Sequence, residues 1–262
     1  MSKHSSAPAL EDDASAPIRL KMSNLLSRAQ MEAQLQIMKV DSLVKDLSLR
    51  LAGKGLSSSE MHAAMSEALA QHPCLVSMIT YDAKGVVQAA EPSQFHFMVG
   101  LDISHSPNVA EMLATWMPVM SDVFQPQRGP AGSTISMPAF DREGKFIGAV
   151  SALFSVPIMM KAILPQLVEG TGFSFTILQR DGKIIYDTDE AQIGMITTQG
   201  EDFAGFPQLQ TLAARVLKNP TGWGTHSYYV DLAHKQVVNK ETCWTTIGGH
   251  GIFWRLALER QI

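Results

Sequence analysis

Three stretches of the chain share one pattern, in which two hydrophobic segments are joined by a turn rich in Asp and Gly. In the stretch 133–154, hydrophobic and polar residues alternate before the turn at 141–144, and a nearly continuous hydrophobic run follows it. Alternation with a period of two is typical of a half-buried strand, and a short continuous run is typical of a fully buried one. The stretches 75–89 and 173–186 repeat this arrangement. Because a lone hairpin is only marginally stable, three of them predict two antiparallel sheets.

A much longer pattern precedes the hairpins. From Pro17 to about Gly55, hydrophobic residues recur every three or four positions, which is typical of an amphipathic helix. At about 1.5 Å per residue, such a helix would be about 50 Å long. We expect its hydrophobic stripe to lie against more than one domain, to pair with another copy of the chain, or to do both. Residues 1–16 lack the hydrophobic core of a signal peptide and are expected to form a disordered lead-in.

The other elements are predicted from capping residues, prolines and short hydrophobic runs. In the first half of the chain they are a helix at 56–71, an irregular segment at 91–107, a short helix at 108–116 and a strand at 119–125. In the second half they are a helix at 156–169 that Pro165 should kink or shorten, a helix at 206–217, and strands at 224–230, 236–247 and 253–259. The sequence therefore predicts an α+β protein in which a sheet-and-helix module occurs twice.

Composition narrows the class of protein. Hydrophobic residues make up 45% of the 262 residues and charged residues 18%, which are values of a globular protein. The net charge of −4 indicates no basic face, so nucleic-acid binding is not expected. No hydrophobic run reaches the length of a transmembrane helix. The two cysteines, Cys74 and Cys243, match no metal-ligand spacing. They could form a disulfide only if the fold brings them together, and buried free cysteines are the commoner case.

Four short motifs, in this order and spacing, carry a family resemblance. They are YDAKG at 81–85, GLDIS at 100–104, FDREGKFIGAV at 140–150 and QRDGKIIY at 179–186. Together with the long first helix, they resemble the double Cache sensor domain over residues 18–259. The resemblance implies an α+β fold in which a long N-terminal helix is followed by two PAS-like modules with antiparallel sheets. It also implies an extracytoplasmic location, periplasmic or extracellular, with an anchor in the full-length protein.

The resemblance divides the chain into five parts. They are a lead-in at 1–16, the long helix at 17–55, a membrane-distal module at 56–155, a connecting helix at 156–171 and a membrane-proximal module at 172–262. In this family the distal module usually holds a small ligand, so a small molecule is the expected partner. No cofactor and no metal site are expected. The long helix offers a surface for a homodimer, and contact with a membrane is expected only through an anchor absent from this chain.

The ligand site of this sequence departs from the family pattern. Members that bind amino acids carry an Arg after the GxDxS motif and an Asp on the strand that leaves the distal hairpin. Here residues 105–108 read HSPN where the Arg is expected, and Ser151-Ala152 stands where the Asp is expected. An Arg fork binds a carboxylate through two parallel hydrogen bonds, so its absence argues against a free amino acid and for a less charged, partly apolar molecule. The candidate ligand-binding residues are Phe97, His105, Trp116, Met120, Asp122, Ser136, Met137 and Ser151.

Several alternatives remain open. Trp116 could equally be a core aromatic residue at the end of a helix, and His105 a histidine of a surface loop. The main functional prediction is a small-molecule-binding sensor domain of a signal-transduction protein, such as a chemoreceptor or a sensor kinase. The alternative is a standalone secreted or lipid-anchored binding protein of the same fold. An enzyme is disfavoured, and no catalytic residue is predicted, because the sequence has no nucleophile-base or metal-ligand pattern.

Overall fold

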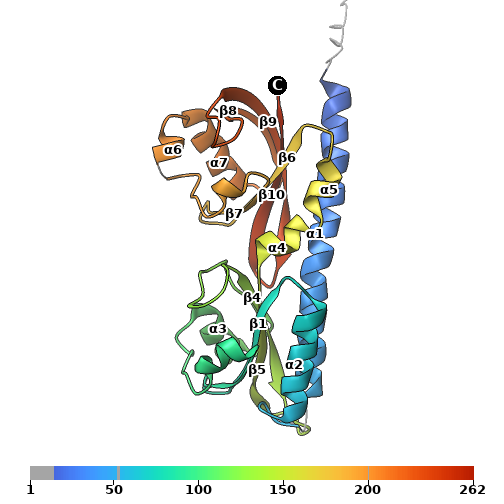
Figure 1. Cartoon of the computed structure of the whole chain (residues 1–262), viewed down its shortest axis with the longest axis vertical. Coiled ribbons are helices and arrows are strands. Elements are labelled where there is room, and N and C mark those ends of the chain that lie inside the picture. Colours follow the sequence, from blue (N-terminus) through green and yellow to red (C-terminus); the bar gives the residue numbers. More distant parts are fainter. Residues whose placement is uncertain (1–14, 52–53, 200) are drawn as a thin grey trace, which may run out of the picture.

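The computed structural model describes residues 15–51, 54–199 and 201–262. One long helix, α1 (Ala16–Arg50), lies beside two five-stranded antiparallel sheets that follow one another along it (Figure 1). This arrangement confirms the predicted fold class. Most of the expected lead-in lies outside the described residues, and α1 ends at Arg50, a few residues before the end expected at 53–55.

The first sheet and its helices form what we call the first module. Its elements are α2 (Ser59–Gln71), β1 (Leu75–Asp82), β2 (Val87–Glu91), η1 (Ser93–Met98), α3 (Pro107–Thr115), β3 (Val119–Met120), β4 (Ser133–Phe140) and β5 (Phe146–Phe154). The strand order is β2-β1-β5-β4-β3, so the last strand lies at the centre. The predicted turn between β4 and β5 forms because the Asp141 carboxylate accepts hydrogen bonds from the N–H groups of Glu143 and Lys145, each at 2.9 Å.

Two short helices, α4 (Val156–Lys161) and α5 (Leu164–Val168), lead to the second module. Its elements are β6 (Phe173–Leu178), β7 (Ile184–Asp187), η2 (Glu190–Gln192), α6 (Glu201–Ala204), α7 (Pro207–Lys218), β8 (Gly222–Tyr229), β9 (Val237–Gly249) and β10 (Ile252–Gln261). Its strand order, β7-β6-β10-β9-β8, repeats that of the first sheet. The prediction that one plan occurs twice is therefore confirmed.

One local prediction is confirmed and two differ from the structure. The helix expected at 156–169, with a kink or an early end caused by Pro165, is two helices, because Pro165 lacks the N–H that would continue the hydrogen-bond ladder. The expected strand at 119–125 ends at Met120, and an isolated bridge joins Phe124 to Gly132 beyond it. The segment expected to be irregular at 91–107 contains the 3-10 helix η1.

Helix α1 covers one face of both sheets. Its buried residues include Met22, Leu26, Ala29, Ala33, Ile37, Val40, Val44 and Leu47. They share the hydrophobic core with both sheets, so the expectation that the helix lies against more than one domain is confirmed. Gln34 fixes its position against the second sheet, since its side chain donates to the Gly248 carbonyl at 2.9 Å and accepts from the Gly248 N–H at 3.1 Å.

The start of α1 and the C-terminus lie at the same end of the molecule, beside the second module (Figure 1). Among the helices formed by the described residues, none combines the length and the apolar character that a membrane span requires. Cys74 and Cys243 are both free, the first in the segment before β1 and the second buried in β9.

Candidate functional site

Each sheet has one face against α1, and a cavity lies on the opposite face. In the first sheet, Met78 and Val150 belong to the core shared with α1. Their neighbours Ile79 and Ser151 line a cavity of about 290 Å³. Successive side chains of a strand point to opposite faces, which is why adjacent residues serve the core and the cavity. We call this space the first cavity.

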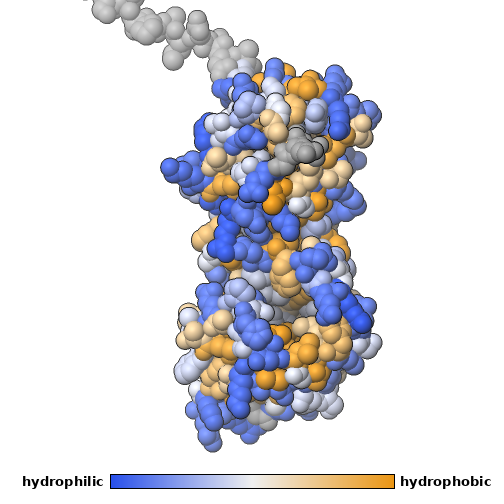
Figure 2. Space-filling model, turned by 90° about the vertical axis from the view of Figure 1, so that its left-hand side faces the viewer, coloured by the Kyte–Doolittle hydropathy of each residue, from blue (hydrophilic) through white to orange (hydrophobic). Residues whose placement is uncertain are grey.

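The first cavity has mostly apolar walls. Its floor is formed by the strands, with Ile79, Tyr81 and Leu153 among the lining residues, and η1 contributes Phe95 and Phe97 on one side. The segment 124–128 closes the cavity beside η1, where Arg128 lies over the Phe97 ring. Figure 2 shows hydrophobic side chains gathered on this face of the first module, and the exposed hydrophobic residues there include Leu101 and Phe124, which also line the cavity.

Few polar groups face the first cavity, and among its lining residues there is no carboxyl group. The Asn108 side chain donates to the Thr134 hydroxyl at 3.2 Å. The Tyr81 ring is fully buried, and this burial raises the pKa of its hydroxyl to about 12, although the nearby Ser136 hydroxyl opposes the rise. Arg128 supplies the single positive charge, and its guanidinium lies 4.6 Å from the centre of the Phe97 ring. The cavity is therefore suited to a ligand that carries little charge.

Two of the eight predicted site residues, Phe97 and Ser151, line the first cavity. Ser136 lies next to it, because its hydroxyl donates to the Ser151 hydroxyl at 2.9 Å across the β4–β5 pair. Met120 and Met137 belong to the core on the α1 side of the sheet. Two methionines of the predicted set are thus separated from the cavity by the sheet itself.

The other three predicted residues lie away from the cavity. Trp116 follows α3, is 54% exposed, and stacks on Phe146 with ring centres 5.5 Å apart. His105 is exposed in the loop before α3. Asp122 lies at the junction of the two modules, where Arg180 pairs with it and the side chain of Gln179 accepts from the neighbouring Val123 N–H. The contact of the eight residues with a ligand stays a prediction.

Sequence reasoning did not select the residues that η1 and the closing segment bring to the first cavity. Phe95 and Arg128 come from irregular segments whose position depends on the rest of the fold, so no periodic signal marks them. Ile79 pairs with Ser151 in the sheet, but this pairing joins strands distant in sequence and no local pattern marks it.

A second cavity of about 410 Å³ lies on the corresponding face of the second sheet, under α7. Its lining is more polar and includes Asp187, His226, Lys240, Thr242 and Glu259. Across the described ranges, no three side chains of His, Cys, Asp or Glu are grouped so that they could hold a metal ion.

Comparison with known proteins identifies the kind of domain. No curated protein sequence matches the chain. Residues 33–156, which comprise the second half of α1 and the whole first module, match the family model described as HK/GC/Chemotaxis protein-like, sensor domain. This part of the chain therefore resembles a sensor domain of this type. The resemblance to double Cache sensors is thereby confirmed, and so is the main functional prediction.

Solved structures of similar fold are also sensor domains. An extracellular ligand-binding receptor from Desulfohalobium retbaense DSM5692 has a TM-score of 0.75 and 26% identity, and the match covers 92% of this sensor domain but 40% of that receptor. The sensor domain thus spans less than half the length of that relative. The extracellular domain of rpHK1S-Z16, described as a histidine kinase, has a TM-score of 0.71 and 16% identity, with 95% and 96% of the two chains covered.

The ligand-binding domain of the amino acid chemoreceptor PctB from Pseudomonas aeruginosa PAO1, in complex with L-Arg, has a TM-score of 0.65 and 15% identity, with 93% and 88% covered. The 16% and 15% identities of the last two relatives mean that their likeness shows the fold alone. The Desulfohalobium retbaense receptor is extracellular and the sensory domain of the Campylobacter jejuni chemoreceptor Tlp1 is periplasmic, and the predicted extracytoplasmic location agrees with both.

Proposed function

We propose that the sensor domain detects a small, mostly apolar molecule of low charge in the first cavity. The observation that carries this proposal is the lining of that cavity, which has aromatic and aliphatic walls, no carboxyl group and one positive charge at its edge. A ligand ammonium group would find no counter-ion there. Solved relatives bind L-Arg, L-Gln and GABA, and the first cavity lacks a carboxyl group that could pair with the ammonium group of such a zwitterion.

The signal would pass from the first cavity to α1 through the sheet. Ser151 and Leu153 line the cavity, and their neighbours Val150 and Ala152 in β5 belong to the core shared with α1. A ligand that binds one packing of β5 against α1 better than another shifts the population between the two. The first module would then be the membrane-distal, ligand-binding module at 56–155, and the second the membrane-proximal module at 172–262. The domain would have no catalytic activity of its own.

A homodimer through α1 is part of the same proposal. Met31, Leu35 and Met38 form an exposed hydrophobic strip on the helix, with exposed fractions of 69%, 51% and 55%. Their spacing of four and three residues matches one seam of a helix pair. No contact with nucleic acid is expected, and contact with a membrane would require an anchor outside this chain.

The test is a thermal-shift screen of the purified chain against alcohols, esters, short fatty acids, aromatic compounds and amino acids. A ligand at one hundred times its dissociation constant should stabilise the protein by about 2.7 kcal/mol, which raises its melting temperature by a few degrees. We expect the stabilising compounds to be those with an apolar body and at most one charge.

The variant Phe97→Ala tests whether the ligand binds in the first cavity. We expect this change to weaken the affinity for the best compound about tenfold, because a cavity wall is lost. Phe253→Ala is the matched control, since Phe253 is 56% exposed at the start of β10. Equal affinities of the two variants would contradict the proposed site. Stabilisation by zwitterionic amino acids that depends on Phe97 would contradict the proposed class of ligand.

A further inference from the structure

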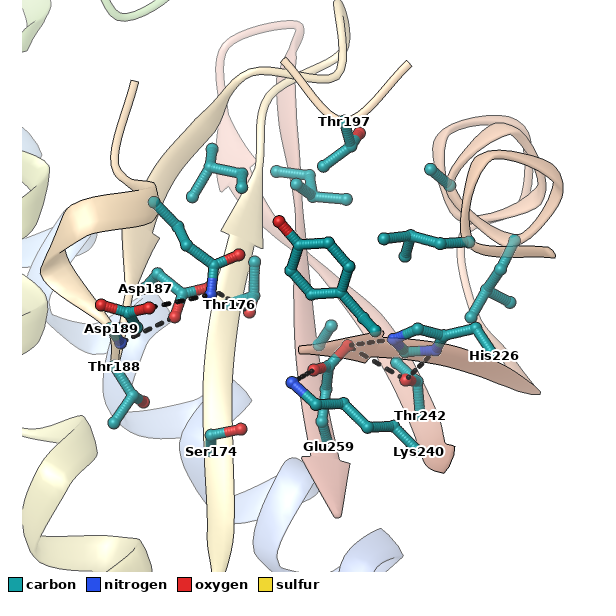
Figure 3. Close-up of a pocket in the computed structure, with 18 of the residues that line it drawn as sticks. Ser174, Thr176, Asp187, Thr188, Asp189, Thr197, His226, Lys240, Thr242 and Glu259 are labelled. Carbon is teal, nitrogen blue, oxygen red and sulfur yellow. Dashed lines mark hydrogen bonds and ion pairs between the residues drawn. The ribbon is translucent and has the colours of Figure 1, made fainter. Parts of the chain in front are cut away.

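Polar side chains line part of the second cavity. It lies between the second sheet and α7, and its lining includes Leu212 and Val216 of α7. Aliphatic and aromatic side chains form the upper walls, while carboxyl, hydroxyl and amino groups gather toward one end of the strands (Figure 3). At about 410 Å³, the space is large enough for a small organic molecule.

Asp187 is the central polar group on one side of the second cavity. It is 6% exposed at the end of β7. Its carboxylate accepts hydrogen bonds from the Thr176 hydroxyl at 2.5 Å and from the Asp189 N–H at 2.8 Å (Figure 3). No cationic side chain of the described residues forms an ion pair with it. Burial raises the pKa of Asp187 to about 7, and the negative charge of Glu259 adds to the rise. A buried carboxyl group without a cationic partner is costly to ionise.

On the other side of the second cavity, Glu259 already has partners (Figure 3). Its carboxylate lies 3.6 Å from the Lys240 ammonium group and accepts a hydrogen bond from the Thr242 hydroxyl at 3.1 Å. His226 lies 3.7 Å from it, and burial lowers the pKa of this histidine, which favours the neutral imidazole. The positive charge of Lys240 is therefore paired with Glu259 in the wall of the cavity.

The charges that line the second cavity do not balance. Asp187, Asp189, Asp231 and Glu259 contribute carboxyl groups, whereas Lys240 contributes the single ammonium group and His226 is neutral. The two other carboxyl groups are engaged locally, Asp231 with His234 and Asp189 with backbone N–H groups. Asp187 is left as the buried carboxyl group that faces the space without a cation.

We propose that the second cavity is a second ligand site, which binds a small organic amine whose ammonium group pairs with Asp187 and whose apolar part lies against Leu178, Leu212 and Tyr228. The ammonium group supplies the positive charge that Asp187 lacks, and the aliphatic walls remove the apolar part from water. This site is separate from the first cavity and takes a ligand of different charge. It extends the proposed function, because one sensor domain would then respond to two chemical classes.

Other ligand classes fit the second cavity less well. An anion would meet an excess of carboxyl groups, and the single Lys is already paired with Glu259. A bare metal ion needs several donor groups at short range, and the described residues do not bring three such side chains together. A neutral molecule would leave Asp187 without the cation that favours its ionised form.

The experiment is isothermal titration calorimetry at pH 7.5 with three probes of similar shape, namely 2-phenylethylamine, 2-phenylethanol and 3-phenylpropionate. In Phe97→Ala, whose first cavity is impaired, we expect the amine to bind at least about tenfold more tightly than the alcohol or the carboxylate. Asp187→Asn should weaken binding of the amine by about the same factor. Asp46→Asn, which changes an exposed carboxyl group on α1, should leave it unchanged.

Two further variants keep the test decisive. Ala213→Leu fills the second cavity from α7, preserves Asp187, and should weaken amine binding even if Asp187→Asn fails to fold. Phe97→Ala alters the first cavity and should leave amine binding unchanged. The proposal is overturned if the alcohol or the carboxylate binds as tightly as the amine and Ala213→Leu weakens that binding, or if no amine binding is detected in folded protein. Retention of amine binding in both second-cavity variants, or its loss in Phe97→Ala, would also overturn it. Because Phe97 reports on the first cavity alone, failure here is separable from failure of the proposed ligand of that cavity.

Discussion

Asp187 gives the sharpest prediction, because the folded protein disfavours its ionised form. Its pKa is raised from 3.8 to about 7 by burial. At about 1.4 kcal/mol for each pKa unit, this difference corresponds to about 4 kcal/mol of folding free energy. Asparagine has almost the same shape and never ionises. Asp187→Asn should therefore stabilise the ligand-free protein at high pH by up to about this amount, less the hydrogen bonds that Asn accepts poorly.

The pH dependence follows from the direction of the shift. Below the unfolded-state pKa of about 4, Asp187 is protonated in both states and costs nothing. As the pH rises from about 4 to about 7, the unfolded chain loses the proton before the folded one does, so the stability of the wild type falls. Above a pH of about 7, the ionised carboxyl group of Asp187 lowers the folding stability by the full amount. The stability difference between variant and wild type should thus be small at pH 4.5, about 1 kcal/mol or less, and reach its maximum by pH 8.

Urea denaturation between pH 4.5 and 8.5 measures this difference. Three of the four tryptophans, Trp223, Trp244 and Trp254, lie in the second module, so their fluorescence reports on it. His226 titrates in both proteins and cancels in the comparison. Asp46→Asn should follow the wild type at every pH. A difference that does not change with pH, or a variant that is less stable at pH 8 than at pH 5 relative to the wild type, would refute the argument.

Two further predictions concern the frame of the first module. Gly148→Ala should destabilise the protein by about 3 kcal/mol or more, because an added Cβ would lie 2.0 Å from the Tyr81 carbonyl oxygen and the residue has a φ of 142°; an unchanged melting temperature would contradict this. Ser58→Ala should cost about 1 kcal/mol in chemical denaturation, because the Ser58 hydroxyl accepts from the Met61 N–H at the start of α2. Ser57→Ala, at an exposed neighbouring position, is its control, and equal losses in the two variants would argue against the cap.

The fold was predictable where local chemistry decides it. The turn at Asp141 needs only an Asp that binds its own backbone, and the hydrophobic stripe of α1 needs only a spacing of three or four residues. The end of α3 was less predictable. Trp116 takes a positive φ of 53° there, a conformation that normally requires Gly, and its stacking on Phe146 is a contact that no local pattern marks.

The first cavity was harder to predict because it depends on which face of each strand is used. Ser136 and Met137 are adjacent in β4, so they point to opposite faces of the sheet and cannot both line one cavity. Only the pairing of Ser136 with Ser151 shows which face that is. The second cavity gave one sequence signal. Asp187 ends a hydrophobic strand, but its burial depends on β10 and α7, which are distant in sequence.

Helix α1 is the common partner of both sheets, and this has a consequence for ligand binding. Each cavity is separated from α1 by one layer of strands, and β5 and β10, the central strand of each sheet, both contact the helix. A ligand in either cavity that alters how its sheet packs against α1 would therefore alter the position of α1. The packing of the other sheet against the helix would then change as well. Two ligands that never meet would then show reciprocal affinities, each altering the binding of the other by the same factor.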